Sequence, residues 1–265
     1  MSILEALILG VLQGLTEFLP VSSSGHLEIG KVILDVNISA SESLFFTVFV
    51  HAATALSTMV VFREDIIMLI RLLFEKARWN AGRQYILFII ISMVPAVFVG
   101  LFFNEQIKSL FDGNLLLAGS MLIVTGVVLF ATTKVKRNRH HIGVLNAIIL
   151  GIAQAIAILP GISRSGATIG TALILGVERT RAARFSFLMV IPVIMGAIAK
   201  DIMDMDMSVA MQETNTLPLI VGFVSAFVTG LLACTWMLEL VKKSKLIYFA
   251  IYCFIVGAFS IIWTF

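Results

Sequence analysis

The sequence carries little charge. Asp, Glu, Lys and Arg make up 13% of its 265 residues, about half of the roughly 25% found in soluble domains. Hydrophobic residues make up 59%, and the mean hydropathy is +1.03. A water-soluble chain of this size cannot bury so much apolar surface, which excludes a soluble enzyme, a nucleic-acid-binding protein and a disordered chain. We therefore predict an all-α polytopic membrane protein.

Cysteine is also scarce, and its two residues, Cys234 and Cys253, both lie in apolar stretches. These surroundings favour small packing residues over a disulfide or a metal-binding pair. The N-terminal segment lacks the basic residues and the cleavage site of a secretory leader, so we expect it to belong to the mature protein. The net charge of +3 is typical of basic loops between spans and says little about a substrate.

Six apolar stretches have the length, about 20 residues, that a helix needs to cross a hydrocarbon core of roughly 30 Å. They are residues 43–62, 84–103, 114–133, 182–203, 217–238 and 246–265. The fourth stretch is interrupted by Arg184 and Pro192. We predict that all six are transmembrane helices.

Two further apolar regions, residues 3–34 and 142–175, are interrupted by proline, glycine and serine. The interruptions begin at Pro20 and Pro160. In each region the arm after the interruption has about a dozen residues, which span only about 18 Å as a helix. Because such an arm cannot cross the membrane, we predict two re-entrant helical hairpins, whose irregular backbone is tolerated where it lines a protein cavity.

The two interrupted regions also resemble each other in sequence. Residues 6–13, ALILGVLQ, match residues 147–154, AIILGIAQ, and the segment SSSG at 22–25 matches SRSG at 163–166. The spacing between the copies is close to 141 residues. The sequence therefore contains an internal repeat.

Each repeat would consist of one re-entrant hairpin and three spans. The first would cover residues 1–133 and the second residues 142–265, within one membrane domain. A hairpin returns to its own side and three spans change side, so the second copy must be inverted. Inverted repeats with broken helices are typical of transporters.

Lysine and arginine indicate the orientation. Fifteen of them lie in four loops on one face and three, Lys31, Lys108 and Lys200, on the other; the loops are 63–83, 134–139, 179–184 and 242–245. Because an excess of positive residues marks the cytoplasmic side, we expect both termini outside. The hairpins would then enter from opposite sides, and their tips would meet near the middle of the membrane.

The hairpins carry the polar residues that point to chemistry. A charged group at membrane depth costs at least about 2.5 kcal/mol on insertion scales, so it is a functional candidate by default. Gln13 and Glu17 share a helix face, while Ser23 and His26 are three residues apart and can meet. The candidate residues are Gln13, Glu17, Ser22, Ser23, Ser24, His26, Ser163, Arg164, Ser165 and Thr168.

These residues favour an anion site. Each interruption exposes free backbone N–H groups at a helix N-terminus, where the partial charge is positive. Two such ends facing each other, with Arg164 and several hydroxyls, would bind an anion strongly. Glu17 could add a divalent cation, so phosphate or pyrophosphate is the expected ligand.

Ordinary structural roles remain open for several of these residues. Any of the serines Ser22, Ser23, Ser24 and Ser163 could be a simple N-cap. His26 could pack at an interface, and Glu17 could pair with Arg164 without doing chemistry. The spaced glycines, Gly10 with Gly14 and Gly166 with Gly170, favour close helix packing over a phosphate loop. His51 lies deep in a predicted span, where we expect a packing role.

Two segments resemble the signature sequences of a known family. Residues 13–26, QGLTEFLPVSSSGH, and residues 160–168, PGISRSGAT, are similar to the two motifs of the undecaprenyl-pyrophosphate phosphatases, also called bacitracin-resistance proteins. The resemblance covers the whole chain and includes the run from Phe185 to Pro192. The family's first motif opens with Glu or Gln, and here that residue is Gln13. Glu17 is therefore expected to be the main metal-binding or basic group.

The resemblance implies a multi-pass phosphatase of the bacterial plasma membrane, with its site open to the periplasm. It would hydrolyse undecaprenyl pyrophosphate to undecaprenyl phosphate and phosphate, which recycles the lipid carrier for cell-wall synthesis. A divalent metal, Mg²⁺ or Ca²⁺, is implied as the cofactor. The membrane and the polyprenyl pyrophosphate lipid are the expected partners; a homodimer stays open, and no nucleic acid is expected.

We expect phosphoryl transfer helped by positioning and charge neutralisation. Ser23 would attack the terminal phosphorus, His26 would take or orient its proton, and Glu17 would set the tautomer of His26 or hold the metal. Arg164 would bind the non-bridging oxygens. The other candidates, Gln13, Ser22, Ser24, Ser163, Ser165 and Thr168, would bind the substrate. Direct attack by His26 is the chemical alternative, and a secondary transporter or lipid flippase is the alternative from another class.

Overall fold

The computed structural model of the chain describes residues 1–75, 80–103, 106–107, 110, 115–135, 140–204, 215–243 and 245–264. These residues form eleven α-helices, with one isolated β-bridge between His140 and Val177. The helices are α1 (Ile3–Phe18), α2 (Ser23–Ile33), α3 (Ala40–Val61), α4 (Arg63–Phe74), α5 (Ala81–Phe102), α7 (Leu115–Thr132), α8 (Val144–Ile156), α9 (Arg164–Ile174), α10 (Arg179–Asp204), α12 (Thr216–Lys242) and α13 (Leu246–Ile262).

Five of these helices are long and apolar enough to cross a membrane. They lie in α3, α5, α7, α10 and α12, and they correspond to the first five predicted spans. The sixth predicted span, 246–265, is the shorter apolar helix α13 of 17 residues, about 26 Å long. The prediction of an all-helical polytopic membrane protein is confirmed.

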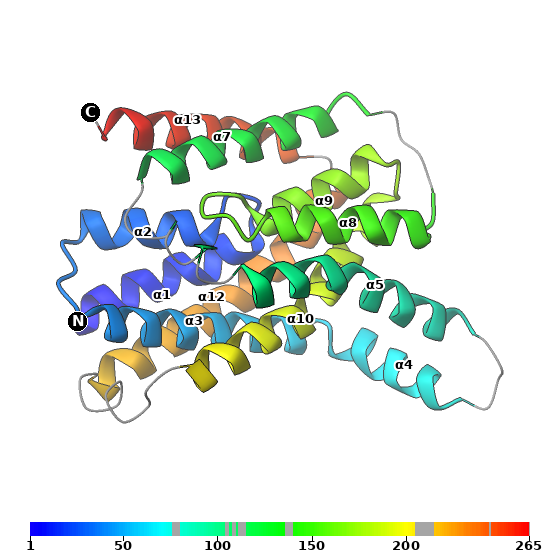
Figure 1. The fold of residues 1–265 in the computed structure, drawn as a ribbon, viewed down its shortest axis with the longest axis horizontal. Coiled ribbons are helices and arrows are strands. Elements are labelled where there is room, and N and C mark those ends of the chain that lie inside the picture. Colours follow the sequence, from blue (N-terminus) through cyan, green and yellow to red (C-terminus); the bar gives the residue numbers. More distant parts are fainter. Residues whose placement is uncertain are drawn as a thin grey trace.

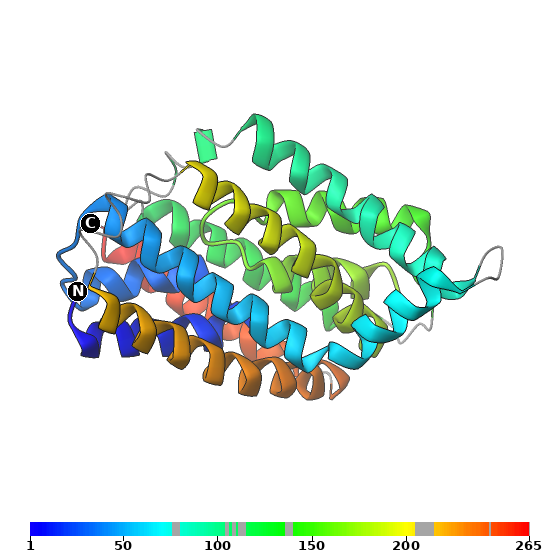
Figure 2. The ribbon, with the colours of Figure 1, turned by 90° about the horizontal axis from the view of Figure 1, so that it is seen from below.

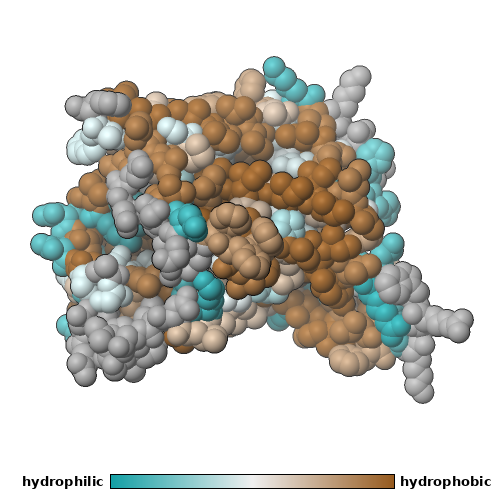
Figure 3. Space-filling view, viewed as in Figure 1, coloured by the Kyte–Doolittle hydropathy of each residue, from teal (hydrophilic) through white to brown (hydrophobic). Residues whose placement is uncertain are grey.

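The surface of the molecule has the pattern of a membrane protein. Many large apolar side chains are exposed, among them Leu101, Leu232 and Ile255. In Figure 3 the hydrophobic surface occupies the middle of the molecule, and the hydrophilic patches gather at its two ends. Such an exposed apolar belt would be unfavourable in water and is favourable in lipid.

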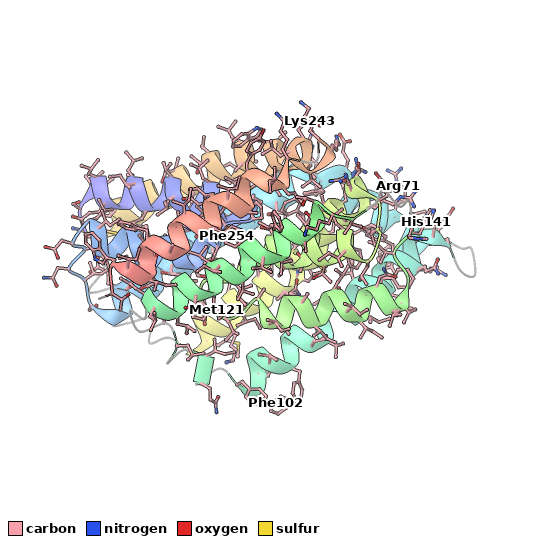
Figure 4. The ribbon with its side chains drawn as sticks, turned by 90° about the horizontal axis from the view of Figure 1, so that it is seen from above. Arg71, Phe102, Met121, His141, Lys243 and Phe254 are labelled. Carbon is pink, nitrogen blue, oxygen red and sulfur yellow. The ribbon has the colours of Figure 1, made fainter. Side chains whose placement is uncertain are left out.

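The ends of the helices fall into two groups. Both chain termini lie at one end of the molecule, and α4 lies at the other (Figure 1). Figure 2 shows the long helices crossing between these ends at moderate angles to one another. Arg71, His141 and Lys243 lie toward the end opposite the termini (Figure 4), so basic residues from three segments far apart in the sequence gather there.

Two of the predicted loops were wrong in part. The segment 63–83 contains α4, which has Glu64 and Asp65 in its first turn and Arg71 in its last. Acidic residues at the start of a helix and a basic residue at its end interact favourably with the helix dipole. In the sequence, however, these charged residues interrupt the apolar pattern by which the helix could have been recognised. The segment 179–184 belongs to α10, which continues through Pro192 to Asp204. The predicted loop 134–139 lies mostly outside the described residues.

Both interrupted regions form a pair of short helices in contact. In the first, α1 has 16 residues and α2 has 11; in the second, α8 has 13 and α9 has 11. Ser22 and Ser163 precede the second helices as N-caps, and their hydroxyls accept the N–H groups of Gly25 and Gly166. Proline, which disfavours a helix interior without forbidding it, acts here together with these serine caps, and the chain leaves the helix at this point in both regions.

Each hairpin packs against a long helix of the other half of the chain. Helix α1 packs on α12, and α8 packs on α5. Both contacts are made through glycine: a Cβ at Gly10 would overlap the backbone of Gly222, and a Cβ at Gly151 would lie 2.6 Å from the Ser92 carbonyl oxygen. Close packing is therefore the role of these glycines, because no side chain fits between the helices.

A large apolar cluster fixes the two hairpins against each other. It joins Phe18 at the end of α1, Leu150 of α8 and Ile169 of α9 to Phe185 and Met189 of α10. All five are buried. The cluster contacts the end of α1 and the first half of α8, and it joins both to α9 and α10.

Candidate active site

Glu17, in the last turn of α1, is the centre of a buried polar cluster. Its Oε2 atom accepts hydrogen bonds from Ser23 Oγ at 2.5 Å and from Gln13 Nε2 at 3.0 Å. Its Oε1 atom accepts from Arg164 Nη2. The carboxylate side chain is 5% exposed, so these partners replace the water that it has lost.

Ser23 and Arg164 reach this carboxylate from two different helix starts. Ser23 is the first residue of α2, and Arg164 is the first residue of α9. Each follows an N-cap serine directly, so its side chain leaves the helix at the end where backbone N–H groups are unpaired. The two helix starts consequently face the same point.

The neighbouring serines form matching pairs around the two caps. Ser22 Oγ lies 3.3 Å from Ser24 Oγ, and Ser163 Oγ lies 3.2 Å from Ser165 Oγ. Ser165 Oγ also donates to the Leu19 carbonyl oxygen at 3.2 Å, which ties the second hairpin to the first. The N-cap role proposed for Ser22 and Ser163 is confirmed; Ser23 and Ser24 are not caps, because both lie inside α2.

His26 and Thr168 make their side-chain hydrogen bonds away from the carboxylate. His26 faces Ser22 and Tyr252: its Nδ1 is 2.8 Å from the Ser22 carbonyl oxygen, and its Nε2 is 2.7 Å from the Tyr252 hydroxyl. Thr168 Oγ1 lies 2.5 Å from Ser186 Oγ and also donates to the Arg164 carbonyl oxygen. Three-residue spacing therefore does not bring the side chains of Ser23 and His26 into a hydrogen bond, because the serine turns to the carboxylate.

Some residues of the cluster were not predicted. His51 of α3 places its Nε2 3.9 Å from Glu17 Oε2, and its Nδ1 is 2.8 Å from the Thr47 carbonyl oxygen. Tyr252 and Ser186 contact two of the predicted residues. The sequence gave one indication for His51, because it is an ionisable residue inside a predicted span. It gave no indication for Tyr252, since a tyrosine in an apolar helix is not unusual.

The donor set near Glu17 fits a divalent cation that arrives with an anion. The Gln13 Oε1 atom is buried and has no hydrogen-bond partner, next to a carboxylate of the kind that Mg²⁺ and Ca²⁺ prefer. Within the described part of the chain, no group of three or more His, Cys, Asp or Glu could hold a metal by itself. The remaining ligands would have to come from a bound anion or water.

This arrangement places a hydroxyl against a buried carboxylate, beside a guanidinium and two helix N-termini. A serine next to a base is the arrangement of an activated nucleophile, and the arginine and helix ends favour an anion. The fold and the site together define a polytopic helical membrane protein with a polar, anion-binding centre.

Comparison with known proteins identifies the family. The family described as bacitracin resistance protein BacA matches residues 6–259. The chain is 55% identical over its whole length to 99% of an undecaprenyl-diphosphatase of Christiangramia forsetii. It is 49% identical, over 97% of both chains, to an undecaprenyl-diphosphatase of Bacteroides fragilis. The chain belongs to the bacitracin resistance protein family.

Proposed function

We propose that the chain is an undecaprenyl-diphosphatase of the plasma membrane. It hydrolyses undecaprenyl pyrophosphate to undecaprenyl phosphate and phosphate, and it thereby recycles a lipid carrier for cell-wall synthesis. The family membership supports this reading, and so do the relatives 49% and 55% identical, both of which are undecaprenyl-diphosphatases. The observation that carries it is the contact of Ser23 and Arg164 with the two oxygens of Glu17.

In the first step, Ser23 Oγ attacks the terminal phosphorus of the pyrophosphate. A bond forms between Oγ and phosphorus, and the bond from phosphorus to the bridging oxygen breaks, so undecaprenyl phosphate leaves. The serine proton passes to Glu17 Oε2, which already accepts the Ser23 hydrogen bond at 2.5 Å. A general base within hydrogen-bond reach is what such a transfer requires.

In the second step, water attacks the phosphoserine. The proton that Glu17 took from Ser23 first leaves with the departing undecaprenyl phosphate. Glu17 Oε2 then takes a proton from the attacking water and returns it to Ser23 Oγ as the bond from phosphorus to Oγ breaks, so phosphate leaves and the Ser23 hydroxyl is restored. Glu17 takes the role expected of His26 because the His26 Nε2 atom is engaged with Tyr252 and does not face Ser23. His26 then supports the site instead of exchanging the proton.

Arg164 binds the phosphate oxygens that gain charge in the transition state. Its guanidinium has five N–H donors, and the contact with Glu17 is made through Nη2. The other donors remain within reach of an anion bound beside the carboxylate, where charge stabilisation accelerates the reaction. The pairing with Glu17 also holds the guanidinium in place before the substrate arrives.

The second phosphate binds at the two helix starts. The first N–H groups of a helix have no intrahelical partner, which leaves those of Ser23 and Arg164 facing the same point. The serine pairs Ser22 with Ser24 and Ser163 with Ser165 add hydroxyls around it. Thr168 supports this site from one turn further along α9, through its contact with the Arg164 carbonyl oxygen.

A divalent metal, Mg²⁺ or Ca²⁺, would be held by Glu17 and by the unpaired Oε1 atom of Gln13. Such ions are commonly bound by one or two protein oxygens together with phosphate oxygens of the substrate. When bound, the ion neutralises negative charge on the pyrophosphate. Gln13 and Glu17 would share the ion with the phosphate oxygens of the substrate. Without the substrate, these two residues would not form a complete metal site.

The two halves of the chain are inverted repeats, residues 1–133 and 142–265, with re-entrant hairpins at 3–34 and 142–175. Gly10 and Gly151, equivalent in the repeat, each pack on the backbone of a long helix from the other half, which supports this symmetry. Both termini lie outside the cytoplasm, and the site opens to the periplasm. The gathering of Arg71, His141 and Lys243 at the opposite end supports this orientation (Figure 4).

The test is phosphate release from undecaprenyl pyrophosphate by the purified protein. We expect turnover with Mg²⁺ or Ca²⁺ and its loss after chelation. Ser23→Ala should abolish release, whereas Ser120→Ala should not, because the Ser120 hydroxyl only donates to the backbone of its own helix. If the protein binds the lipid but releases no phosphate with any divalent metal, the phosphatase proposal is wrong and a transporter or flippase remains.

A further inference from the structure

The His26 ring is held at both of its nitrogens. Nδ1 lies 2.8 Å from the Ser22 carbonyl oxygen, and Nε2 lies 2.7 Å from the Tyr252 hydroxyl oxygen. The two rings are also stacked, with centroids 5.6 Å apart and an interplanar angle of 14°. His26 belongs to α2 in the first half of the chain and Tyr252 to α13 in the second.

These contacts fix the tautomer of His26. A backbone carbonyl oxygen can only accept, so Nδ1 carries the proton and donates it to Ser22. In the neutral ring, Nε2 then has a lone pair and accepts the hydrogen bond from the Tyr252 hydroxyl. Which nitrogen of a histidine is protonated is generally set by the partner of the other nitrogen.

The Ser22 carbonyl that His26 holds belongs to the peptide bond that precedes Ser23. Ser22 has a φ of 69°, in the left-handed region that non-glycine residues rarely adopt. A residue in this region persists only where its surroundings hold it. The His26 contact therefore holds the peptide from which the Ser23 side chain is directed at Glu17.

We propose that Tyr252 is a positioning residue for Ser23 and acts through His26. The Tyr252 hydroxyl fixes the His26 ring, the ring fixes the Ser22–Ser23 peptide, and the peptide sets the direction of Ser23 Oγ. This inference rests on the proposed function, since Ser23 is the nucleophile there. It gives α13, a helix outside both hairpins, a part in the reaction.

The position of Tyr252 allows its hydroxyl to be removed without disturbing the fold, so its role in the reaction can be tested separately. Its side chain is 41% exposed, and α13 packs chiefly on α7 rather than on α2. Removal of the hydroxyl therefore leaves the apolar contacts of α13 in place. Tyr248, one turn earlier on the same helix, is 66% exposed and provides a matched control.

The first experiment is steady-state phosphate release by Tyr252→Phe, which keeps the ring and removes the hydroxyl. We expect kcat to fall about three- to tenfold, as expected for one lost neutral hydrogen bond, with KM within about twofold of the wild type. Tyr248→Phe should match the wild type in both constants. An unchanged kcat in Tyr252→Phe would overturn the proposal.

A double-variant cycle tests whether Tyr252 acts through His26. In a His26→Ala background, Tyr252→Phe should cause no further loss of kcat, because residues that act through one contact are not additive. Multiplication of the two losses would overturn the proposal, since Tyr252 would then act independently of His26.

A spectroscopic measurement covers the case in which His26→Ala fails to fold. In protein labelled with ¹⁵N-histidine, the His26 signals should show protonated Nδ1 and unprotonated Nε2, and Tyr252→Phe should shift the Nε2 signal. Tyr248→Phe should leave it unchanged. An Nε2 signal that Tyr252→Phe does not move would overturn the proposal. This readout needs no substrate, so it distinguishes failure of this inference from failure of the phosphatase proposal.

Discussion

Ser23 and Arg164 occupy equivalent positions in the two hairpins and contact opposite oxygens of a single carboxylate. They are 141 residues apart, each follows an N-cap serine, and each begins an 11-residue helix. Ser23 reaches Glu17 Oε2, and Arg164 reaches Oε1. The repeat thus supplies a hydroxyl from one copy and a positive charge from the other, and Glu17 joins them.

This division of roles predicts different kinetic defects for the two residues. Ser23→Ala should abolish turnover and leave binding of the pyrophosphate lipid nearly intact, because a nucleophile contributes mainly in the transition state. Arg164→Lys keeps the charge but loses the planar fork, and should lower the rate about a hundredfold or more. Single-turnover phosphate release, measured beside equilibrium binding of the same lipid, distinguishes the two. Near wild-type hydrolysis by Ser23→Ala would exclude Ser23 as the nucleophile.

Glu17 should matter for stability as well as for activity. Glu17→Gln leaves the Arg164 guanidinium without its counter-charge, and breaking a buried ion pair costs about 3–5 kcal/mol. Because the Arg164 side chain is 23% exposed, we expect a loss toward the lower end of this range. Thermal unfolding in detergent measures it. The double variant Glu17→Gln with Arg164→Gln should be more stable than Glu17→Gln alone, because it leaves no unpaired buried charge. A lower melting temperature for the double variant would contradict the assignment of this loss of stability to the ion pair.

The short helices could be predicted because their causes are local. Pro20 and Pro160 end an apolar run, and a serine two or three residues later offers an N-cap to the next helix. Helix α4 was missed because its terminal charges, which stabilise the helix, obscure its apolar face. Helix α10 was predicted as a span across Pro192 because its apolar run continues on both sides of the proline, and the structure has a single helix there.

Some contacts of the residues around Glu17 could also be predicted from the sequence, and others could not. Glu17 and Arg164 had to be partnered once both were placed at membrane depth, so their pairing follows from the cost of a lone charge there. The contacts of His51 and Tyr252 depend on where α3 and α13 lie in the bundle, which the repeat does not specify. The expected contact of Ser23 with His26 failed because spacing defines a shared helix face but not the competing partner.

The glycine contacts predict that alanine substitutions at two glycines, both inside apolar helices, have different effects on stability. Gly151→Ala would place a Cβ 2.6 Å from the Ser92 carbonyl oxygen, so α8 must move away from α5. Such overpacking typically costs about 1–3 kcal/mol. Gly100 has open space around its missing Cβ, so Gly100→Ala should be neutral or slightly stabilising, since alanine favours a helix by up to about 1 kcal/mol. Equal melting temperatures for the two variants would contradict this account of the packing.

The proposed orientation predicts which surface residues react from outside the cell. Single cysteines would be placed at Asn37, Asn215, His141 and Lys243, all of them exposed, in a background without Cys234 and Cys253. Asn37 lies between α2 and α3, and Asn215 directly precedes α12. The start of α3 and the start of α12 lie at the end of the molecule that holds both termini (Figure 1), so cysteines at these two positions should react with an impermeant maleimide in intact cells.

Cysteines at His141 and Lys243 should react only after lysis, because the basic end of the molecule faces the cytoplasm (Figure 4). Reaction of all four in lysed cells is the control for accessibility. If His141 or Lys243 is labelled in sealed cells while Asn37 and Asn215 are protected, the molecule has the opposite orientation, and the site cannot open to the periplasm as proposed. Labelling of one member from each pair would instead contradict the arrangement of helix ends on which the inverted repeat depends.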